Sequence, residues 1–425
     1  PDSLVTLWES DTQVGALWGS HSYPNFFDLR SQNTTFERVA CYHGSNHIMT
    51  GRGEPVRLRS EVVTADLFSL LGVAPMLGRN FLPDDDKPSE RVVILSHALF
   101  QKRFNSDPAL INQAITLEGS SFTVIGVMPP DFEFPIQNDP VELWTTIAGD
   151  ASGKSPVTDA RGAHFLKVIG RLKPGVTEAQ AQADLTAIGA RLEQQYPDTN
   201  THKSLRLYPA FETLVEDVRP ALLILLAAVA CVLLIACANV ANLLLSKAAL
   251  RQKEIGIRLA LGASRWRVIK QLLTESALFS LVGGLLGLLI AFGGVKLLIA
   301  FGPSNIPRLT EIGIDTSVLG FTLVLSLFTS VIFGLVPALQ ASRPGLTESL
   351  KEGGRSSASG VYSQRHRMLL VISEVALALL LSIGAGLMVR SFWSVQSISP
   401  GFDPEHVLSL RITLAASKYS AEHPR

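Results

Sequence analysis

The residues that come closest to a nucleotide-binding motif lie between Gly149 and Ser155 of this 425-residue chain. A phosphate-binding loop reads G-x-x-x-x-G-K-S/T and runs directly into a helix. Here only three residues separate Gly149 from Gly153, and Pro156 follows the Gly-Lys-Ser triplet where that helix would begin. The segment therefore predicts a solvated loop, and we expect no ATP chemistry from it.

Two histidines have the spacing of a metal-binding pair. His43 and His47 would share one face of a helix and could hold a metal ion there, but Gly44 and Ser45 between them disfavour a helix. The acidic run 84–86 lacks the spacing of a calcium loop, and neither a nucleophile elbow nor a supported pair of carboxylates is visible. We therefore expect no catalytic residue, no metal site and no cofactor.

Charge divides the chain into two halves. Lys and Arg number 37, as do Asp and Glu, and the resulting net charge of zero argues against a dedicated nucleic-acid binder. Residues 1–218 nevertheless hold 18 bases and 27 acids, a net of −9, whereas residues 219–425 carry a net of +9. Charged residues make up 17% of the chain and hydrophobic residues 47%, against about 25% charged residues in soluble domains. This composition excludes a disordered chain and disfavours a wholly soluble protein.

Four apolar segments are long enough to cross a bilayer, which takes about 20 residues; they are 220–246, 276–301, 318–341 and 368–390. The loops between them predict their orientation. Residues 247–271 carry seven bases and one acid, and residues 343–367 carry five bases and two acids, so both loops are expected in the cytoplasm. Residues 1–218 and the tail 391–425 are then expected outside.

Residues 1–218 have the pattern of an α+β domain. Residues 121–129 and 164–172 have the composition of strands. Thr177 opens a helix with a Thr-Glu-Ala-Gln capping box, and this helix is expected to stop before Pro197. The predicted fold class is a membrane α-helical bundle of four transmembrane helices plus an extracytoplasmic α+β domain.

Polar and small residues interrupt the apolar segments. Glu374 is an ionisable residue inside a membrane segment, which is costly, so it indicates a transport or coupling role, with helix packing and snorkelling as the alternatives. Asn239 and Asn242 are expected to hydrogen-bond to a neighbouring helix. A face of small residues lets another helix approach closely, and it is formed by Gly283, Gly287 and Ala291.

The segment 247–272 combines bases with hydrophobic residues at helical spacing, namely Leu250, Ile257 and Leu261. Gly262 can end one helix and Ser264 can cap the next, which predicts a basic helical elbow at the cytoplasmic face. The alternative is an ordinary basic loop in contact with lipid headgroups. Such a loop rarely has this apolar pattern, so a docking surface for a cytoplasmic partner is favoured.

The stretch 251–263, RQKEIGIRLALGA, resembles the coupling region of FtsX-like and MacB-like ABC transporter permeases, whose pattern is R-x-x-E-I-G-I-R-x-A-x-G-A. The phrases SYPNFFDLR (22–30), LFSLLGVAPMLGRNF (67–81) and FTVIGVMPPDFEFP (122–135) resemble the MacB-type periplasmic core domain. Together with 336–353, which resembles the exit from the family's third crossing, these matches cover nearly the whole chain. The resemblance implies that an ATPase docks on Arg251, Glu254, Ile255, Gly256, Ile257, Arg258 and Gly262.

The resemblance also implies a domain plan. It comprises an extracytoplasmic core domain (1–218), an FtsX-like membrane domain of three helices (219–342) that contains the coupling segment (247–272), a cytoplasmic linker (343–367), a fourth transmembrane helix (368–390) and the start of a second extracytoplasmic domain (391–425). The last two parts resemble the second half of a large duplicated permease, of which this chain would be a fragment.

The function implied by the resemblance is that of a non-catalytic permease subunit. It would couple ATP hydrolysis by a cytoplasmic ABC ATPase to motion of the extracytoplasmic domain for export. The expected location is the bacterial inner membrane, and the expected partners are lipid, a second permease half or copy and a periplasmic protein, but no nucleic acid. The alternative is an FtsX-like signal transmitter that regulates an extracytoplasmic enzyme without moving substrate.

Two further classes fit the sequence less well. A membrane-anchored enzyme would need a converging set of titratable groups in residues 1–218. A secondary transporter would need polar or broken helices near the bilayer midplane. The sequence displays neither pattern.

Overall fold

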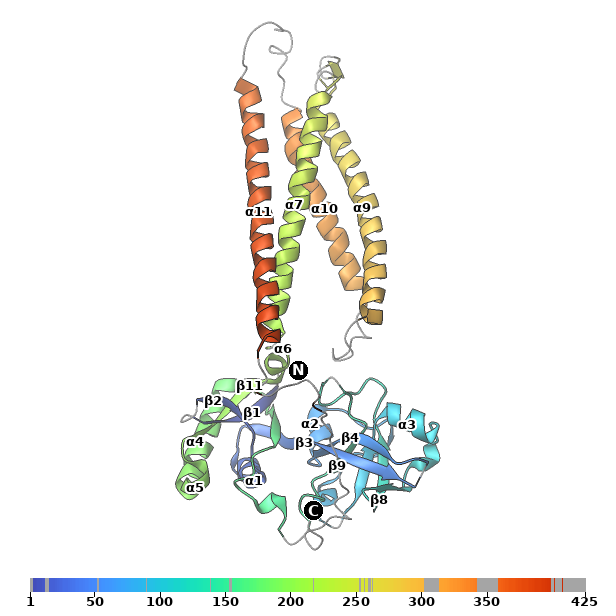
Figure 1. Cartoon of the computed structure of the whole chain (residues 1–425), viewed down its shortest axis with the longest axis vertical. Coiled ribbons are helices and arrows are strands. Elements are labelled where there is room, and N and C mark those ends of the chain that lie inside the picture. The colour runs from blue at the N-terminus through green and yellow to red at the C-terminus, as the bar shows by residue number, and fades with distance from the viewer. Residues whose placement is uncertain are drawn as a thin grey trace. The chain divides into compact units, whose positions relative to one another are not determined.

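A computed structural model describes residues 3–401 and Val407, except for 12–14, 52, 89, 138, 153–154, 217, 252–253, 256, 259–260, 262, 302–312, 342–357 and 399–400. The chain divides into two compact units, which we term the sheet unit (Pro1–Val218) and the helical unit (Arg219–Leu408). Both are drawn in Figure 1. Most of the tail expected to open a second domain lies outside the described residues.

The sheet unit is built on one mixed sheet with the strand order β11-β1-β10-β3-β4-β9-β6-β8-β5, to which β2 and β7 add at the side. Its strands are β1 (Leu4–Asp11), β2 (Ala16–Gly19), β3 (Phe36–Thr50), β4 (Val56–Val63), β5 (Leu77–Gly78), β6 (Val92–Leu95), β7 (Ala114–Leu117), β8 (Ser120–Val127), β9 (Leu143–Thr146), β10 (Lys167–Leu172) and β11 (Lys203–Pro209). Its helices are α1 (Tyr23–Gln32), α2 (Leu67–Leu71), α3 (His97–Phe104), α4 (Glu178–Gln195), α5 (Pro197–Asn200) and α6 (Ala210–Val215), with 3₁₀ turns at Pro83–Asp86, Pro108–Leu110 and Val157–Asp159.

Strand β3 is the longest strand and contributes to all three apolar cores of the sheet unit. Phe36 and Cys41 join the core beneath α1 and α4. Ala40 belongs to the core around Trp144, and Met49 belongs to the core beneath α3. Since successive side chains of a strand point to opposite faces, one long strand can serve cores on both sides of the sheet.

The strands and the helix expected near residue 177 are confirmed. The predicted segment 121–129 covers β8 except for Ser120, the segment 164–172 contains β10, and α4 ends at Gln195 before Pro197. Thr177 caps α4, since its hydroxyl accepts from the Gln180 N–H at 3.3 Å while the Gln180 side chain accepts from the Thr177 N–H at 2.9 Å. These two bonds satisfy donors that would otherwise have no partner at the helix start.

The helical unit contains α7 (Arg219–Leu250), α9 (Arg265–Phe301), α10 (Thr316–Ala341) and α11 (Ala358–Gln396). Helix α10 contacts α7 and α9, and α11 contacts α7 (Figure 1). Large apolar side chains face outward along these helices; Leu226 is 65% exposed and Leu289 is 70% exposed. Such surfaces are unfavourable in water and are typical of helices that face lipid.

Three helices of the described chain are long and apolar enough to cross a membrane, with spans Arg219–Leu243, Trp266–Phe301 and Met368–Gln396. In α10 the described apolar stretch is the shorter Thr316–Thr329, so a fourth crossing stays a prediction. The helices themselves are longer than the apolar segments predicted. Helix α11 begins at Ala358, inside what the sequence indicated was a cytoplasmic linker, whereas α9 begins at Arg265, directly after the predicted cap at Ser264. Both helices exceed their apolar segments because helical structure continues through the polar residues that flank an apolar run.

Described residues of the two candidate motifs of the sheet unit make structural contacts. His43 and His47 lie on β3, where residues four apart are separated by roughly 13 Å, so they do not share a metal. His47 Nδ1 instead lies 2.7 Å from Ser60 Oγ. His43 Nε2 lies 2.7 Å from Asp150 Oδ2, which also accepts from Tyr23 Oη at 2.6 Å. Asp150 thus ties the Gly149–Ser155 segment to the core, while Gly153 and Lys154 lie outside the described residues.

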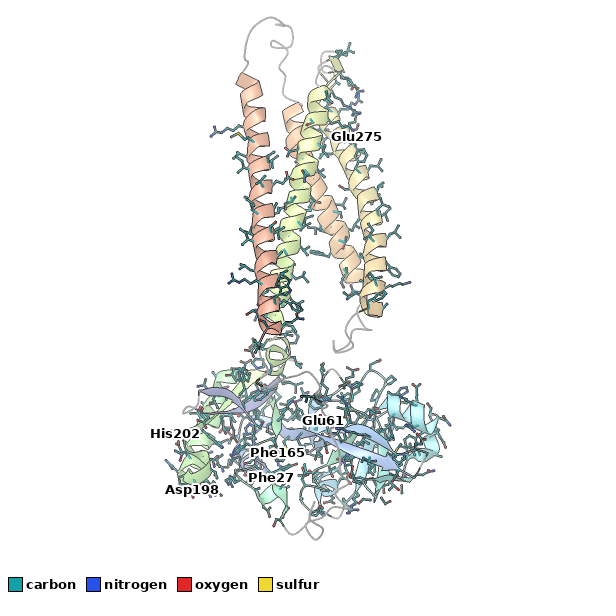
Figure 2. All side chains as sticks on the ribbon, in the orientation of Figure 1. Phe27, Glu61, Phe165, Asp198, His202 and Glu275 are labelled. Atoms are coloured by element: carbon teal, nitrogen blue, oxygen red, sulfur yellow. The ribbon has the colours of Figure 1, made fainter. Side chains whose placement is uncertain are left out.

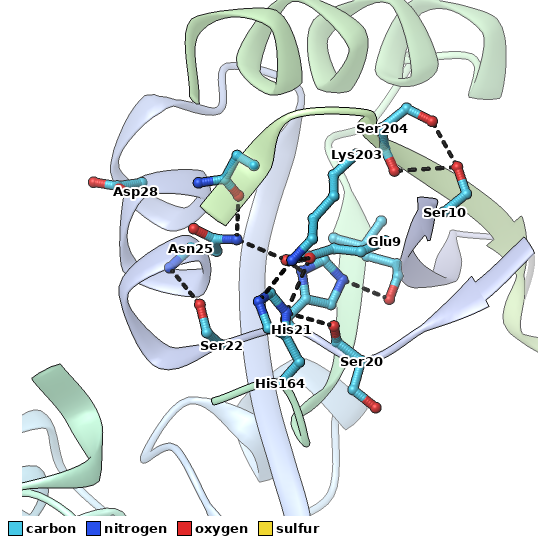
Figure 3. A network of polar contacts seen from close by, with 12 residues as sticks. Glu9, Ser10, Ser20, His21, Ser22, Asn25, Asp28, His164, Lys203 and Ser204 are labelled. Atoms are coloured by element: carbon cyan, nitrogen blue, oxygen red, sulfur yellow. Dashed lines mark hydrogen bonds and ion pairs between the residues drawn. The ribbon is translucent and has the colours of Figure 1, made fainter. Parts of the chain in front are cut away.

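A buried polar network centred on Glu9 joins β1, α1 and β11 with His21 and His164, which lie between elements (Figure 3). Glu9 is 4% exposed, and its oxygens lie 3.2 Å from His21 Nδ1 and 3.1 Å from His164 Nδ1. Asn25 Nδ2 donates to Glu9 Oε1 at 2.9 Å, and Lys203 Nζ donates to His164 Nε2 at 2.8 Å. Burial alone would raise the pKa of Glu9, but the hydrogen bonds and charges of His164 and His21 hold it well below its usual range.

Glu61 of β4 is a second buried acid, in a different environment. It is 4% exposed, and its Oε2 has no hydrogen-bond partner in the described structure. Burial raises the pKa of this carboxyl group to about 7, although the charges of Lys167 and His43 oppose the shift. The folded state therefore binds a proton more tightly than the unfolded state, and Glu61 makes the fold less stable as pH rises from about 4.5 to about 7.

Replacing Glu61 with Gln is expected to stabilise the sheet unit at pH 8 and to have little effect at pH 5. The variant avoids the free energy of ionising a buried carboxyl group. For a pKa raised from 4.5 to about 7, this free energy is on the order of 3 kcal/mol at 1.36 kcal/mol per pKa unit. Thermal unfolding of the full chain in detergent checks this, with an increase in Tm of roughly 5–10 °C expected at pH 8. Glu37→Gln, at an exposed position of β3, is the control. An equal shift at both pH values would contradict the assignment.

Candidate functional site

The helical elbow between α7 and α9 is the candidate functional site. Helical hydrogen bonding continues beyond α7, since Ile255 N–H donates to the Arg251 carbonyl and Leu261 N–H donates to the Ile257 carbonyl, both at 3.0 Å. Ala263 N–H then donates to the Arg258 carbonyl, a bond typical of a helix end. The described residues of the elbow thus form helical turns that follow α7 and lead into α9.

Ser264 caps α9 as predicted. Its hydroxyl oxygen accepts from the Arg267 N–H at 3.4 Å, and its carbonyl accepts from the same N–H at 3.0 Å. Gly256 and Gly262, which the resemblance includes among the docking residues, lie outside the described residues. The cap fixes where α9 begins and so fixes the return path of the chain.

A polar network holds the elbow to the first turns of α9. Glu275 of α9, labelled in Figure 2, accepts from Arg251 Nη1 at 3.2 Å and lies 3.7 Å from Lys247 Nζ. Gln271 Nε2 donates to Glu275 Oε1 at 3.3 Å, and Gln271 Oε1 accepts from Arg258 Nη1 at 3.0 Å. These bonds cross from the elbow to α9 and hold the two together.

The sequence interpretation missed Glu275 and Gln271. The charge pattern of the basic segment predicted a basic surface but no ion-pair partner for its bases. Gln271 lies at the end of that segment and Glu275 lies beyond it. Their spacing of four residues places them on one face of α9, and Glu275 is the first acid after seven bases. That isolated acid was the available signal for an ion-pair partner.

The side chains of the elbow divide into two groups. Ile255 is 6% exposed, and Val268 and Ile269 of α9 are 7% and 9% exposed. The side chain of Ile255 is thus buried in the elbow, and its predicted contact with an ATPase stays a prediction. Arg251 is likewise engaged with Glu275.

The second group faces outward. Leu250 is 87% exposed, Ile257 62%, Leu261 83% and Trp266 69%. Glu254 and Arg258 are exposed beside them and pair with each other at 2.5 Å. We term Leu250, Glu254, Ile257, Arg258, Leu261 and Trp266 the elbow surface. Exposed apolar side chains bordered by charged groups are typical of a protein interface.

The predicted polar and small residues of the membrane segments lie in different environments. Asn242 has a buried Oδ1 without a hydrogen-bond partner in the described structure, and Asn239 is exposed. Glu374 is half-buried on α11. Gly283 and Gly287 have open space where a Cβ would point, whereas a Cβ at Gly284 would lie 3.6 Å from Ser326 Oγ of α10. The contact with α10 therefore uses the glycine beside the predicted stripe of Gly283, Gly287 and Ala291.

Family models match both units of the chain. Residues 3–188 match the MacB-like periplasmic core domain, and residues 226–346 match the FtsX-like permease C-terminal domain. The chain belongs to the MacB-like, FtsX-like ABC transporter permeases. The sheet unit of this permease is accordingly the extracytoplasmic domain, and the elbow lies inside its FtsX-like region.

Curated relatives of this permease agree with that assignment. "Uncharacterized ABC transporter permease YvrN" of Bacillus subtilis is 27% identical over 305 residues, which are 68% of this chain and 69% of that protein. "Macrolide export ATP-binding/permease protein MacB" of Chromobacterium violaceum is 29% identical over 323 residues, which are 72% of this chain and 47% of that protein. This permease spans about half the length of the MacB relatives it matches.

Among solved structures, the periplasmic region of MacB from Actinobacillus actinomycetemcomitans aligns with a TM-score of 0.38 and 13% sequence identity. The alignment covers 51% of this permease and 92% of that chain.

Proposed function

We propose that this permease couples ATP hydrolysis by a cytoplasmic ABC ATPase to motion of its extracytoplasmic domain and thereby drives export. The elbow surface is the observation that carries the proposal. It presents apolar groups and one exposed ion pair, while the buried side of the elbow is held to α9 through Glu275. A partner that pushes on this surface would move α7 and α9 together.

The length of the helices supports transmission across the membrane. Helix α9 has 37 residues, which corresponds to about 55 Å at 1.5 Å per residue. The hydrocarbon core of a bilayer is only about 30 Å thick, so α9 extends well beyond it. A continuous helix of this length is suited to carry motion from one side of the membrane to the other.

The proposed topology has four crossings in the bacterial inner membrane, with α10 as the third. The bases around the elbow favour its cytoplasmic placement and an extracytoplasmic location of the sheet unit. A second permease half or copy is proposed to pack on the open face of Gly283 and Gly287. Lipid surrounds the remaining apolar surface, and a periplasmic partner protein would bind the sheet unit.

The combined replacement Glu254→Ala and Arg258→Ala tests the coupling. These side chains pair with each other. Replacing both therefore leaves neither of them behind without its charged partner. Losing charge-assisted contacts of about 2–3 kcal/mol would weaken ATPase docking by roughly 30-fold or more. The measurement is stimulation of the cognate ABC ATPase by the permease in nanodiscs.

The matched control replaces a pair of exposed charges in the sheet unit, Arg206→Ala with Glu212→Ala. It should leave stimulation unchanged. Full stimulation by the elbow variant would overturn the docking assignment. Normal docking without export, together with recovery of a cell-wall enzyme on the sheet unit, would favour signal transmission in place of transport.

A further inference from the structure

A polar cavity of about 460 Å³ opens on the sheet unit along β3 and β4. Its lining includes Gly44 and Asn46 of β3 and Arg57, Arg59 and Glu61 of β4. The strand register pairs Gly44 with Glu61 and Asn46 with Arg59, so these residues belong to the same face of the sheet. A cavity of this volume accommodates a small ligand.

Glu61, labelled in Figure 2, is the unusual member of this lining. Its Oε2 is fully buried and has no hydrogen-bond partner within the described part of the chain. Oε1 lies beside Gly44, where a Cβ would come within 3.6 Å of it. A buried carboxyl group without a hydrogen bond is unfavourable, so folding alone gives no reason for an acid at this position.

The cations around Glu61 differ in what they already bind. Arg59 forms an ion pair with Asp139. Lys167 of β10 and His43 of β3 act on Glu61 through their charge, and Glu142 lines the cavity. Arg57 makes neither an ion pair nor a hydrogen bond with any described residue and is exposed. One guanidinium group of the cavity therefore has its donors available.

Glu61 also acts as a donor near neutral pH. Its pKa is raised to about 7 by burial, so below that pH it carries a hydroxyl hydrogen. Glu61 and Arg57 are four residues apart on one strand, roughly 13 Å along it. A ligand that satisfies both must accept hydrogen bonds at its two ends. A cationic ligand is disfavoured, because it would lie against the positive charges of Arg57 and Arg59.

We propose that this cavity binds a small acid whose carboxylate pairs with Arg57 and whose other end accepts a hydrogen bond from Glu61. The carboxylate supplies the counter-charge that Arg57 lacks, and the acceptor hydrogen-bonds to Glu61 at Oε1, the oxygen beside Gly44. Short peptides with a free carboxyl terminus and sugar acids share this chemistry. The inference does not depend on ATPase coupling, because the cavity lies entirely within the sheet unit.

Calorimetry on the full chain in nanodiscs tests the proposal with two probes and their neutral analogues. The probes are N-acetyl-diglycine and glucuronate, and the analogues are the corresponding carboxamides. At pH 6, at least one acid is expected to bind at least tenfold more tightly than its amide, and which acid binds distinguishes a peptide from a sugar ligand. Binding should weaken severalfold at pH 8, because ionised Glu61 no longer donates.

Three variants locate the binding. Arg57→Gln should weaken it about tenfold, whereas Arg103→Gln, an exposed arginine of α3 away from the cavity, should leave it unchanged. Gly44→Ala places a methyl group over Glu61 Oε1 in contact with no other atom within 4 Å, so the variant should fold and lose affinity. Hydrogen exchange in 44–46 and 57–61 should slow when the acid binds.

Three outcomes would overturn the proposal. They are equal binding of an acid and its amide, unchanged affinity in Arg57→Gln, and absence of binding by both probes at millimolar concentration. Loss of binding in Arg103→Gln would also overturn it, because it would place the ligand elsewhere. ATPase stimulation measured on the same nanodiscs separates these failures from a failure of the coupling proposal.

Discussion

Replacing Leu261 with Asp is expected to weaken ATPase docking more than tenfold while the helical unit stays folded. Leu261 is 83% exposed, so the helical unit loses little packing in the variant. If the side chain is buried on docking, about 1.5–3 kcal/mol of apolar burial is lost, and an unpaired carboxylate must also be desolvated at the interface. ATPase stimulation in nanodiscs, titrated with the ATPase, measures the change as a shift in half-saturation.

Two matched variants separate docking from other effects. Leu261→Met keeps an apolar side chain and should retain most of the stimulation. Leu82→Asp introduces the same acid at an exposed leucine of the sheet unit, which is 51% exposed, and should have no effect. If Leu261→Asp stimulates like the parent chain, the elbow surface contacts lipid headgroups and not a protein.

Replacing Glu9 with Ala is expected to destabilise the sheet unit by about 3–5 kcal/mol. The variant leaves His21, His164 and Lys203 without their shared carboxylate in a buried site, and unpaired buried charge is strongly destabilising. It also removes one of the two acceptors of Asn25 Nδ2. Thermal unfolding of the full chain should show the sheet-unit Tm falling by roughly 10 °C or more.

The pH dependence gives this prediction a second readout. The pKa of Glu9 is held well below its unfolded value of about 4.5, so its ionisation stabilises the fold above that pH and the stabilisation is lost as pH falls. The difference in Tm between the parent chain and Glu9→Gln should therefore shrink below pH 4.5. Glu37→Ala, at an exposed position of β3, should change the Tm little at any pH. A constant difference would show that Glu9 acts through shape and not through charge.

Local sequence signals predicted several elements of this fold correctly. The capping box at Thr177 and the cap at Ser264 involve residues within three positions of each other, so the sequence contains all of their information. The spacing of Leu250, Ile257 and Leu261 indicated an apolar surface, and all three side chains are exposed. Hydropathy likewise placed the centres of the membrane segments, although α9 and α11 continue beyond their apolar parts.

Contacts between distant residues could not be predicted in this way. Glu9 meets His164 across 155 positions and Asn25 meets Asn200 across 175, and no local pattern relates these residues. Ile255 and Ile257 are chemically alike, but only the packing of the elbow on α9 decides that the first is buried and the second exposed. The cavity at Glu61 depends on the register of β3 and β4, which the sequence alone does not specify.

The sharing of β3 among three cores determines how the sheet unit behaves under load. The cores around Phe36, Ala40 and Met49 are joined by one unbroken strand. Bending between them requires breaking the hydrogen bonds that β3 makes with β10 and β4. We therefore expect the three cores to move as one body, because bending one against the next would cost several hydrogen bonds of β3.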